Sequence, residues 1–176
     1  MAELEYIITE DASPDRAKMG GKAAALAELS GKFTIPEWFV ITPKAFLECL
    51  TDAQKQTVKS GDPVGEIRFK KAVKEAIIHA TEQLADSNQL LAVRSSATAE
   101  DGKHASFAGQ LESYLNAEAK QVPEKVREVW YSAFSDHVTH YRKTFSDSSE
   151  WIPAVIVQRM VKADVAGVAF SADPVA

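Results

Sequence analysis

The sequence predicts a domain in which helices pack against a mixed β-sheet, of the α/β or α+β class. Segments with the apolar spacing of helices alternate with short runs rich in β-branched residues along the 176-residue chain. Such alternation is typical of helices that cover a sheet. The composition, with 45% hydrophobic and 26% charged residues, is that of a globular chain able to bury a core without disulfides.

The first part of the chain is expected to hold two helices around one strand. Residues 20–29 combine Ala, Leu and Glu with apolar positions three residues apart, which favours a helix. A strand is expected at 38–41, because Pro36 cannot donate a ladder hydrogen bond and the residues after it are aromatic or β-branched. Thr42 and Pro43 then suit the cap and the first position of a second helix.

A cluster of Pro, Gly and Asp at 59–65 is the clearest break in the pattern. It is followed by a long amphipathic helix, expected at 66–84. The uninterrupted apolar run 90–93 indicates a buried strand that ends abruptly at Arg94, and a long polar loop follows. Because no internal repeat is visible, the chain is interpreted as one structural unit with loop-rich interruptions.

The remaining elements alternate in the same way. An extended segment at 112–115 leads to a helix that begins at 122, and another helix is expected around 137–145. The chain closes with two strand-like runs, at 154–160 and 165–171.

Charge and hydropathy exclude several classes of protein. The formal net charge is −5, which argues against general binding to nucleic acid or acidic membranes, so any anion site must be local. No apolar run approaches the roughly 18–20 residues that span a bilayer, and the acidic start lacks the basic region of a signal peptide. We therefore expect a cytoplasmic protein. Its single cysteine, Cys49, lies among apolar residues and is expected to fill the core.

Lys22 stands where the backbone favours an anion. It follows two glycines, Gly20 and Gly21, at the expected start of a helix, where free N–H groups attract a phosphate and glycine lets it approach. The pattern is not a Walker loop, because Arg16 and Ala23 stand where that motif needs a glycine and a hydroxyl. A tight turn with a solvated lysine is the alternative interpretation.

Arg94 follows a buried apolar run, where a guanidinium is costly unless it faces a cleft or a carboxylate. The hydroxyls of Ser95, Ser96 and Thr98 come next. A charged fork beside several hydroxyl donors suits bidentate recognition of a phosphate. The alternative is an ion pair with Glu100, Asp101 or another acid.

Other polar residues carry weaker signals. The segment 102–110 is rich in glycine and small residues, typical of a flap that closes over a ligand, but no catalytic partner is evident for His104. His137 and His140 lie three residues apart on a predicted helix without further metal ligands, so no metal site is assigned. Gln158 lies within an apolar strand, so its amide must meet either a ligand or a backbone group.

Taken in order, these motifs resemble the N-terminal nucleotide-binding domain of the phosphoenolpyruvate synthase and pyruvate phosphate dikinase family. The resemblance rests on six blocks, at 20–26, 35–42, 92–101, 106–110, 157–160 and 167–171. Each block is weak alone, whereas their shared order over nearly the whole chain is specific. The run Arg-Ser-Ser-Ala-Thr-Ala-Glu-Asp is more similar to phosphoenolpyruvate synthase and rifampicin phosphotransferase than to the dikinase.

The resemblance implies an α+β, ATP-grasp-like fold, in which residues 1–176 form chiefly the first nucleotide-binding subdomain, with a loop-rich break near 59–65. It implies a phosphotransferase of the pyruvate, water dikinase type. ATP would phosphorylate a carrier histidine in another domain, and the phosphoryl group would pass to pyruvate. The alternatives are another acceptor, such as a rifampicin-type antibiotic or a glucan, and a non-catalytic nucleotide-binding module.

The resemblance also implies roles for five residues. Lys22 and Arg94 would contact the phosphates of ATP, and Arg94 would be catalytic as well. Gly109 and Ser113 would lie in the loop over the nucleotide, and Gln158 would lie beside it. Ser113 stands where the family commonly has threonine, which preserves the hydroxyl.

Further parts of the family's machinery are expected beyond residue 176. These are the Mg²⁺ ligands, the phosphocarrier histidine domain and the pyruvate-binding domain, so this chain alone is expected to be inactive. Without the rest of the clasp, we expect the runs near 154 and 165 to lack partner strands and to leave open sheet edges, which favour dimerisation or disorder.

Overall fold

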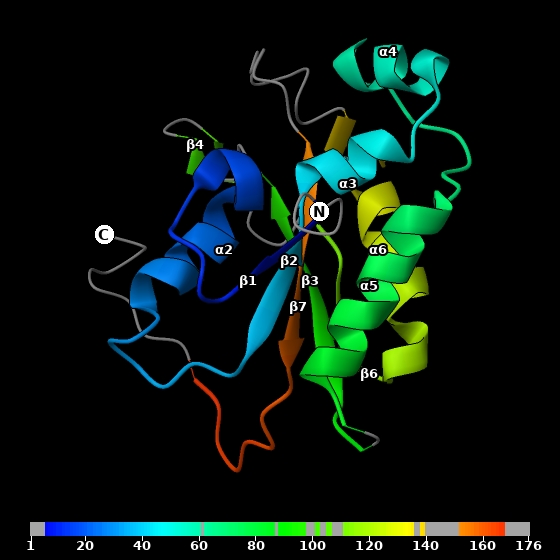
Figure 1. Ribbon diagram of the computed structural model, residues 1–176. Coiled ribbons are helices and arrows are strands. Elements are labelled where there is room, and N and C mark those ends of the chain that lie inside the picture. Colours follow the sequence, from blue (N-terminus) through cyan, green and yellow to red (C-terminus); the bar gives the residue numbers. More distant parts are fainter. Residues whose placement is uncertain are drawn as a thin grey trace.

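Five strands form one antiparallel sheet, and helices cover both of its faces (Figure 1). The computed structural model describes residues 6–60, 62–86, 88–97, 101–102, 105–106, 111–135, 138–139 and 152–167. Its strands and helices are β1 (Ile7–Thr9), α2 (Arg16–Leu29), β2 (Trp38–Ile41), α3 (Pro43–Glu48), α4 (Asp52–Ser60), α5 (Lys71–Leu84), β3 (Leu91–Ala97), β4 (Asp101–Gly102), β5 (Ala105–Ser106), β6 (Ser113–Ala117), a 3₁₀ turn (Ala119–Gln121), α6 (Val122–Ser132) and β7 (Pro153–Arg159). The α+β class is confirmed.

The sheet has the order β1-β2-β7-β3-β6, and each neighbouring pair is antiparallel. The prediction of a mixed sheet is therefore wrong for the described strands. The physical reason is the position of β7. Since β2 and β3 are each antiparallel to β7, they run parallel to each other, as the alternating pattern suggests, but β7 separates them.

The position of β7 also corrects the expectation of an open edge near residue 154. β7 pairs with β2 on one side and with β3 on the other. Residues 153–158 are all buried, as expected for a near-continuous apolar run that forms a central strand. Residues 165–167 belong to no strand. The rest of that run, and most of the helix expected around 137–145, lie outside the described residues.

Helix boundaries follow local chemistry where a cap is available. Thr42 caps α3 by accepting a hydrogen bond from the Ala45 N–H at 3.3 Å, as predicted. The helix expected at 66–84 begins only at Lys71. The reason is that the backbone N–H of the buried Ile67 donates to the Tyr131 hydroxyl at 2.6 Å, which holds the preceding segment against α6 in a non-helical conformation.

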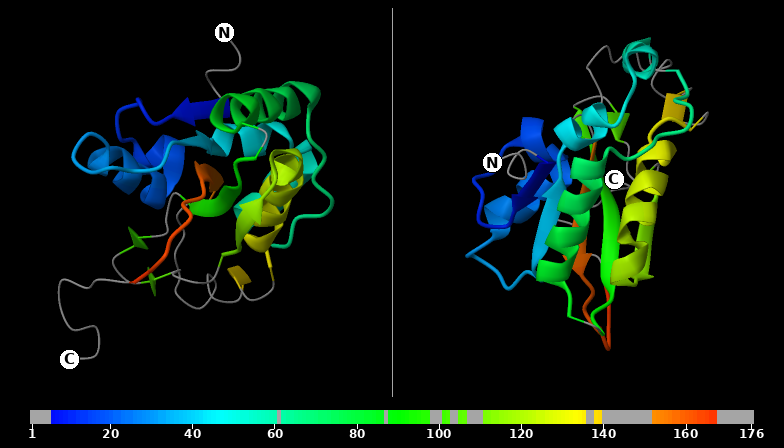
Figure 2. Two further views of the ribbon diagram at one scale, coloured as in Figure 1. Left: turned by 90° about the horizontal axis from the view of Figure 1, so that it is seen from below. Right: turned by 45° about the vertical axis from the view of Figure 1, so that its right-hand side comes forward.

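The two faces of the sheet carry different layers. α5 and α6 lie side by side over one face (Figure 2), and the larger apolar core, which includes Cys49 as predicted, lies beneath them. α2 covers the other face. Its Ala23 and Ala24 are fully buried and, together with Met19, pack on Trp38 and Ile156 of the sheet. Small side chains bring the backbone of α2 close to the strands, and this closeness shapes the candidate site.

Candidate functional site

The glycine pair forms a break inside α2. The helix starts at Arg16, earlier than predicted, because Asp15 caps it by accepting a hydrogen bond from the Ala17 N–H at 3.0 Å. Gly20 then has φ 79° and ψ 171°, which no helix can contain, and α2 is kinked there. Lys22 therefore lies at the start of a second helical segment, which agrees with the predicted surroundings of this lysine.

The break lies directly against β3. A Cβ atom added to Gly20 would come within 1.9 Å of the carbonyl oxygen of Ser96 and 2.5 Å of its Oγ. The Ser96 hydroxyl accepts a hydrogen bond from the Ala23 N–H at 3.0 Å and donates one to the Met19 carbonyl at 2.8 Å. Glycine at position 20 is thus required both by its φ and by the approach of the strand.

Lys22 reaches the part of β3 that carries Arg94. Its side chain is half-buried, and its Nζ donates to the Oγ of Ser95 at 3.5 Å. Ser95 directly follows Arg94 in the chain. Lys22 and Arg94, which are predicted to bind one phosphate group, thus belong to two elements that pack against each other, α2 and β3.

Arg94 lies within β3 and not at its end. The strand continues to Ala97, which pairs with Pro153, and Ser96 pairs with Ala154. The prediction that the strand stops at Arg94 is wrong because β7 supplies partners over this whole length. The buried Ser96 hydroxyl is satisfied by α2, so a serine is tolerated where the sequence suggested a loop.

Gln158 holds Arg94 through its side-chain amide. The Nη1 of Arg94 donates to the Oε1 of Gln158 at 3.4 Å, and the Nε2 of Gln158 donates to the Pro36 carbonyl at 3.1 Å. The Gln158 side chain is only 8% exposed. Among the side chains that the structure describes, no carboxylate forms an ion pair with Arg94. The side chains of the alternative partners, Glu100 and Asp101, lie outside this set.

The register of the sheet places three predicted site residues on one face. Arg94 pairs directly with Ser113 of β6 and with Ile156 of β7, which packs under α2. Directly opposed residues share a face. Ser113 is exposed beside Arg94, and Gln158 lies two residues along from Ile156, so it faces the same side. Gly109 lies outside the described residues.

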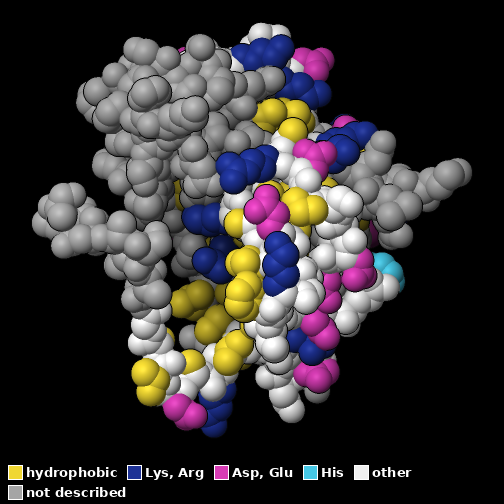
Figure 3. Space-filling view, turned by 90° about the vertical axis from the view of Figure 1, so that its left-hand side faces the viewer, with side chains coloured by type: hydrophobic (Ala, Val, Ile, Leu, Met, Phe, Trp, Pro, Cys, Tyr) yellow, Lys and Arg dark blue, Asp and Glu magenta, His cyan; other side chains and the backbone are white. Residues whose placement is uncertain are grey.

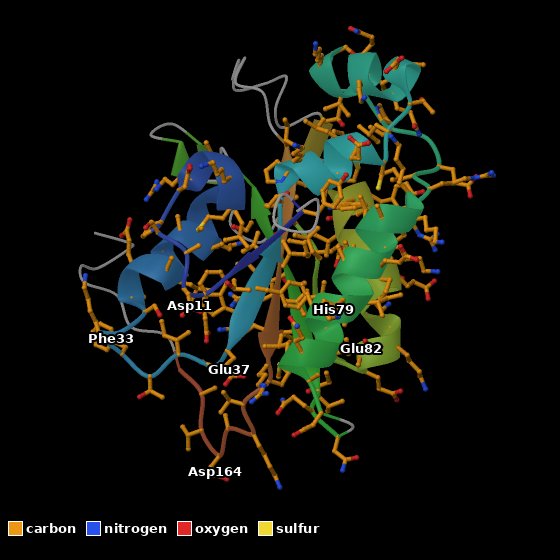
Figure 4. All side chains as sticks on the ribbon, in the orientation of Figure 1. Asp11, Phe33, Glu37, His79, Glu82 and Asp164 are labelled. Carbon is orange, nitrogen blue, oxygen red and sulfur yellow. The ribbon has the colours of Figure 1, made fainter. Side chains whose placement is uncertain are left out.

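The loop between α2 and β2 closes one end of this face. It carries the Pro36 carbonyl that Gln158 binds, and it is anchored by an ion pair of 3.0 Å between Glu37 and Arg159. Arg159 also donates from Nε to the Leu84 carbonyl at 2.6 Å. Figure 4 shows Glu37 at the base of β2, with Phe33 further out in the same loop. Phe33 is 66% exposed.

The surface on the α2 side combines positive charge with apolar area. Figure 3 shows basic side chains gathered near the middle of this side, next to exposed hydrophobic side chains. The exposed hydrophobic residues of the described chain include Phe33, Leu115, Val161 and Val165. Cations beside hydroxyl donors can bind an anion such as a phosphate, and the guanidinium can do so through two parallel hydrogen bonds.

Comparison with known proteins places the chain in a family. Residues 16–176 match the family model described as pyruvate phosphate dikinase, AMP/ATP-binding domain. The chain belongs to this family. The match confirms the predicted resemblance, which rested on the order of short blocks along the chain.

Several known proteins are similar to this chain along most of its length. It is 34% identical over 200 residues to rifampicin phosphotransferase of Bacillus subtilis, an alignment that covers 99% of this chain and 23% of the relative. This chain is 33% identical over 186 residues to phosphoenolpyruvate synthase of Aeropyrum pernix, and the alignment covers 89% of this chain and 23% of that relative. This chain is 34% identical over 176 residues to prodigiosin synthesizing transferase PigC of Serratia marcescens, and the alignment covers 95% of this chain and 20% of that relative. The chain spans about a fifth of the length of these relatives.

Two further observations concern the described part of this family member. No described helix has both the length and the apolar character that crossing a membrane demands. No group of three or more His, Cys, Asp or Glu residues within the described ranges is arranged to hold a metal ion. His104, His137 and His140 are not among the described residues.

Sequence reasoning missed two parts of the site in this family member. The first is the carbonyl of Pro36, which accepts a hydrogen bond from Gln158 and orients it. Nothing in the sequence pointed to this role, apart from the position of Pro36 just before a strand. The second is the inward position of Ser96, which was treated as a phosphate donor. Strand alternation from Arg94 could have placed Ser96 on the same face as the arginine, but contact with α2 depends on tertiary packing.

Proposed function

We propose that this chain is the ATP-binding part of a phosphoenolpyruvate synthase-like phosphotransferase of the pyruvate, water dikinase type. In this proposal ATP phosphorylates a carrier histidine in another domain, and the phosphoryl group passes from that histidine to pyruvate. The observation that carries the proposal is the packing of α2, which bears Lys22, against β3, which bears Arg94, in a chain that belongs to an AMP/ATP-binding family.

The role of the chain is to position the triphosphate and to neutralise its charge. Lys22 provides a compact positive charge from α2, whereas Arg94 presents a planar fork from the sheet. Gln158 and Ser113 lie on the same face as Arg94 and complete its surroundings. Gly109 is assigned to the covering loop on the basis of the family resemblance.

The fold proposed for residues 1–176 is the first subdomain of an ATP-grasp-like clasp. The exposed apolar side chains next to the basic ones suit the flat face of the adenine ring of a nucleotide. The Mg²⁺ that accompanies ATP would be held by ligands outside this chain, and the carrier-histidine and pyruvate domains would likewise lie outside it. Alone, the chain is proposed to bind nucleotide without completing phosphoryl transfer.

For the phosphoryl acceptor, one specific alternative to pyruvate is supported. Rifampicin phosphotransferase of Bacillus subtilis matches nearly the whole chain. An antibiotic hydroxyl is therefore the second candidate acceptor, with the same chemistry at the ATP phosphates. The two candidates are separated by assaying the complete gene product with pyruvate and with rifampicin in the presence of ATP and Mg²⁺.

The ATP assignment is tested by calorimetric titration of ATP and Mg²⁺ into the complete gene product. Lys22→Ala and Arg94→Ala should each weaken ATP binding by about ten- to a hundred-fold, because each removes charge-assisted hydrogen bonds to phosphate. Lys74→Ala is the matched control, since Lys74 is exposed on α5 over the opposite face. Equal affinity in all four proteins would overturn the assignment.

A further inference from the structure

We propose that Ser96 is a positioning residue for Lys22, and that its hydroxyl holds open the break in α2 from which Lys22 projects. The importance of Lys22 rests on the proposed function, in which this lysine binds the phosphates of ATP. The hydrogen bonds of Ser96 and its contact with Gly20 are independent of that function, and they carry the structural half of the proposal.

The hydroxyl links two groups that a continuous helix would join directly. In an unbroken α-helix the N–H of Ala23 donates to the carbonyl of Met19, four residues earlier. In α2, the Ala23 N–H instead donates to the Ser96 Oγ at 3.0 Å, and this Oγ donates to the Met19 carbonyl at 2.8 Å. A hydroxyl can serve both groups because it is a donor and an acceptor at once. Insertion of a side chain into the helical ladder is a known cause of a kink.

The surroundings of Ser96 keep solvent away from these groups. Ser96 and Ala23 are fully buried, and Met19 is 1% exposed. The close approach of Gly20 to the Ser96 backbone presses the break against β3. If the hydroxyl were removed while the break stayed open, the Ala23 N–H and the Met19 carbonyl would each lose a partner away from solvent, which is unfavourable.

The break determines where Lys22 points. Lys22 lies between the break at Gly20 and Ala23, whose N–H is bound by Ser96. Closing the break into a continuous helix would restore the direct bond between the backbones of Met19 and Ala23. It would also turn the segment that carries Lys22 relative to β3. The Lys22 side chain would then leave the Ser95 hydroxyl on β3.

The experiment is a double-mutant cycle on ATP affinity, measured by calorimetry with the complete gene product. Ser96→Ala should weaken ATP binding about tenfold, the equivalent of roughly 1.4 kcal/mol, and should leave adenosine binding unchanged. In a Lys22→Ala background, Ser96→Ala should cause no further loss, because the lysine it positions is gone. An equal loss in both backgrounds would show that Ser96 does not act through Lys22 and would overturn the proposal.

The matched control is Thr81→Val. The Thr81 hydroxyl is also buried and donates to a helix carbonyl, that of Ile77, at 2.7 Å, but it lies in α5 on the opposite face of the sheet. This variant should lower the melting temperature without changing ATP affinity. If Ser96→Ala behaves like Thr81→Val, with lower stability and unchanged affinity, Ser96 is only structural and the proposal fails.

A second measurement applies even if Ser96→Ala does not fold. Amide hydrogen exchange of the unaltered protein should show a strongly protected N–H at Ala23, despite the break in the helix beside it. Rapid exchange at Ala23 would overturn the proposal. If the unaltered protein binds no ATP, the proposed function fails, whereas slow exchange at Ala23 still supports the role of Ser96 at the break.

Discussion

The two faces of the sheet differ in what they bury. Under α5 and α6 the core is large and apolar, and its centre is aromatic: Trp130 lies 5.4 Å from Phe46 and 5.2 Å from Phe69 between ring centroids. Under α2 the apolar cluster is small, and buried polar groups lie among it, chiefly Ser96 and Gln158. The α5/α6 face is suited to stability, whereas the α2 face holds the Arg94 side chain through a buried amide.

This difference shows how a small domain can separate stability from binding. Apolar burial stabilises without fixing the direction of any polar group. On the α2 face the Gln158 amide bonds to Arg94 and Pro36, and the Ser96 hydroxyl bonds to Met19 and Ala23. Fully satisfied polar groups of this kind impose one arrangement, because any other leaves a buried group unpaired.

The largest expected effect on stability lies on the α5/α6 face. Trp130→Ala should lower the free energy of unfolding by about 3–5 kcal/mol, because it empties a fully buried aromatic site. Thermal or denaturant unfolding measures the loss. The ATP affinity of the protein that remains folded should not change. A clear fall in that affinity would contradict the separation of the two faces.

The next effect lies at the break in α2. Gly20→Ala should lower stability by about 1–3 kcal/mol through backbone strain and should weaken ATP binding as well, because the new Cβ would overlap the Ser96 carbonyl. Gly31→Ala is the matched control. Gly31 has a similar φ of 76°, but no atom lies within 4 Å of its added Cβ. Equal ATP affinity in the two variants would rule out the close approach as the cause.

A smaller effect is expected at the amide that holds Arg94. Gln158→Glu should weaken ATP binding about five- to tenfold, because a carboxylate beside Arg94 competes with phosphate for the guanidinium. Gln89→Glu provides the comparison, since the Gln89 amide also donates to carbonyls, those of Leu90 and Met160, away from Arg94. Calorimetry should detect the loss only for Gln158→Glu.

The smallest expected effect is on the pH dependence of stability, and it arises from Tyr114 of β6, beneath α6. Burial, followed by the hydrogen bond to Glu128, raises the pKa of Tyr114 to about 12. In the unfolded chain the Tyr114 hydroxyl would lose its proton near pH 10. The contribution of protonated Tyr114 to the stability of the folded state is therefore complete below pH 10 and is lost as pH rises towards about 12. Melting temperatures between pH 9 and 11 should fall less steeply for Tyr114→Phe. Identical slopes would contradict the assignment.

Local sequence signals were sufficient where the determining contacts are local. The strand at 38–41 and the cap at Thr42 followed from nearby residues, and Lys22 and Arg94 were singled out by glycine, burial and charge. The interior position of β7 could not be predicted in this way, because its partners lie far away in sequence. The same holds for Ser96, whose partners in α2 precede it by more than 70 residues.

The central claim is that Lys22 and Arg94 face one phosphate-binding site. It is tested most directly by nuclear magnetic resonance of the Lys22 Nζ and Arg94 guanidinium signals during titration with ATP and Mg²⁺. Both signals should shift at the same ATP concentration, and adenosine should leave both unchanged. A response of only one of them, or of neither at saturating ATP, would contradict the account.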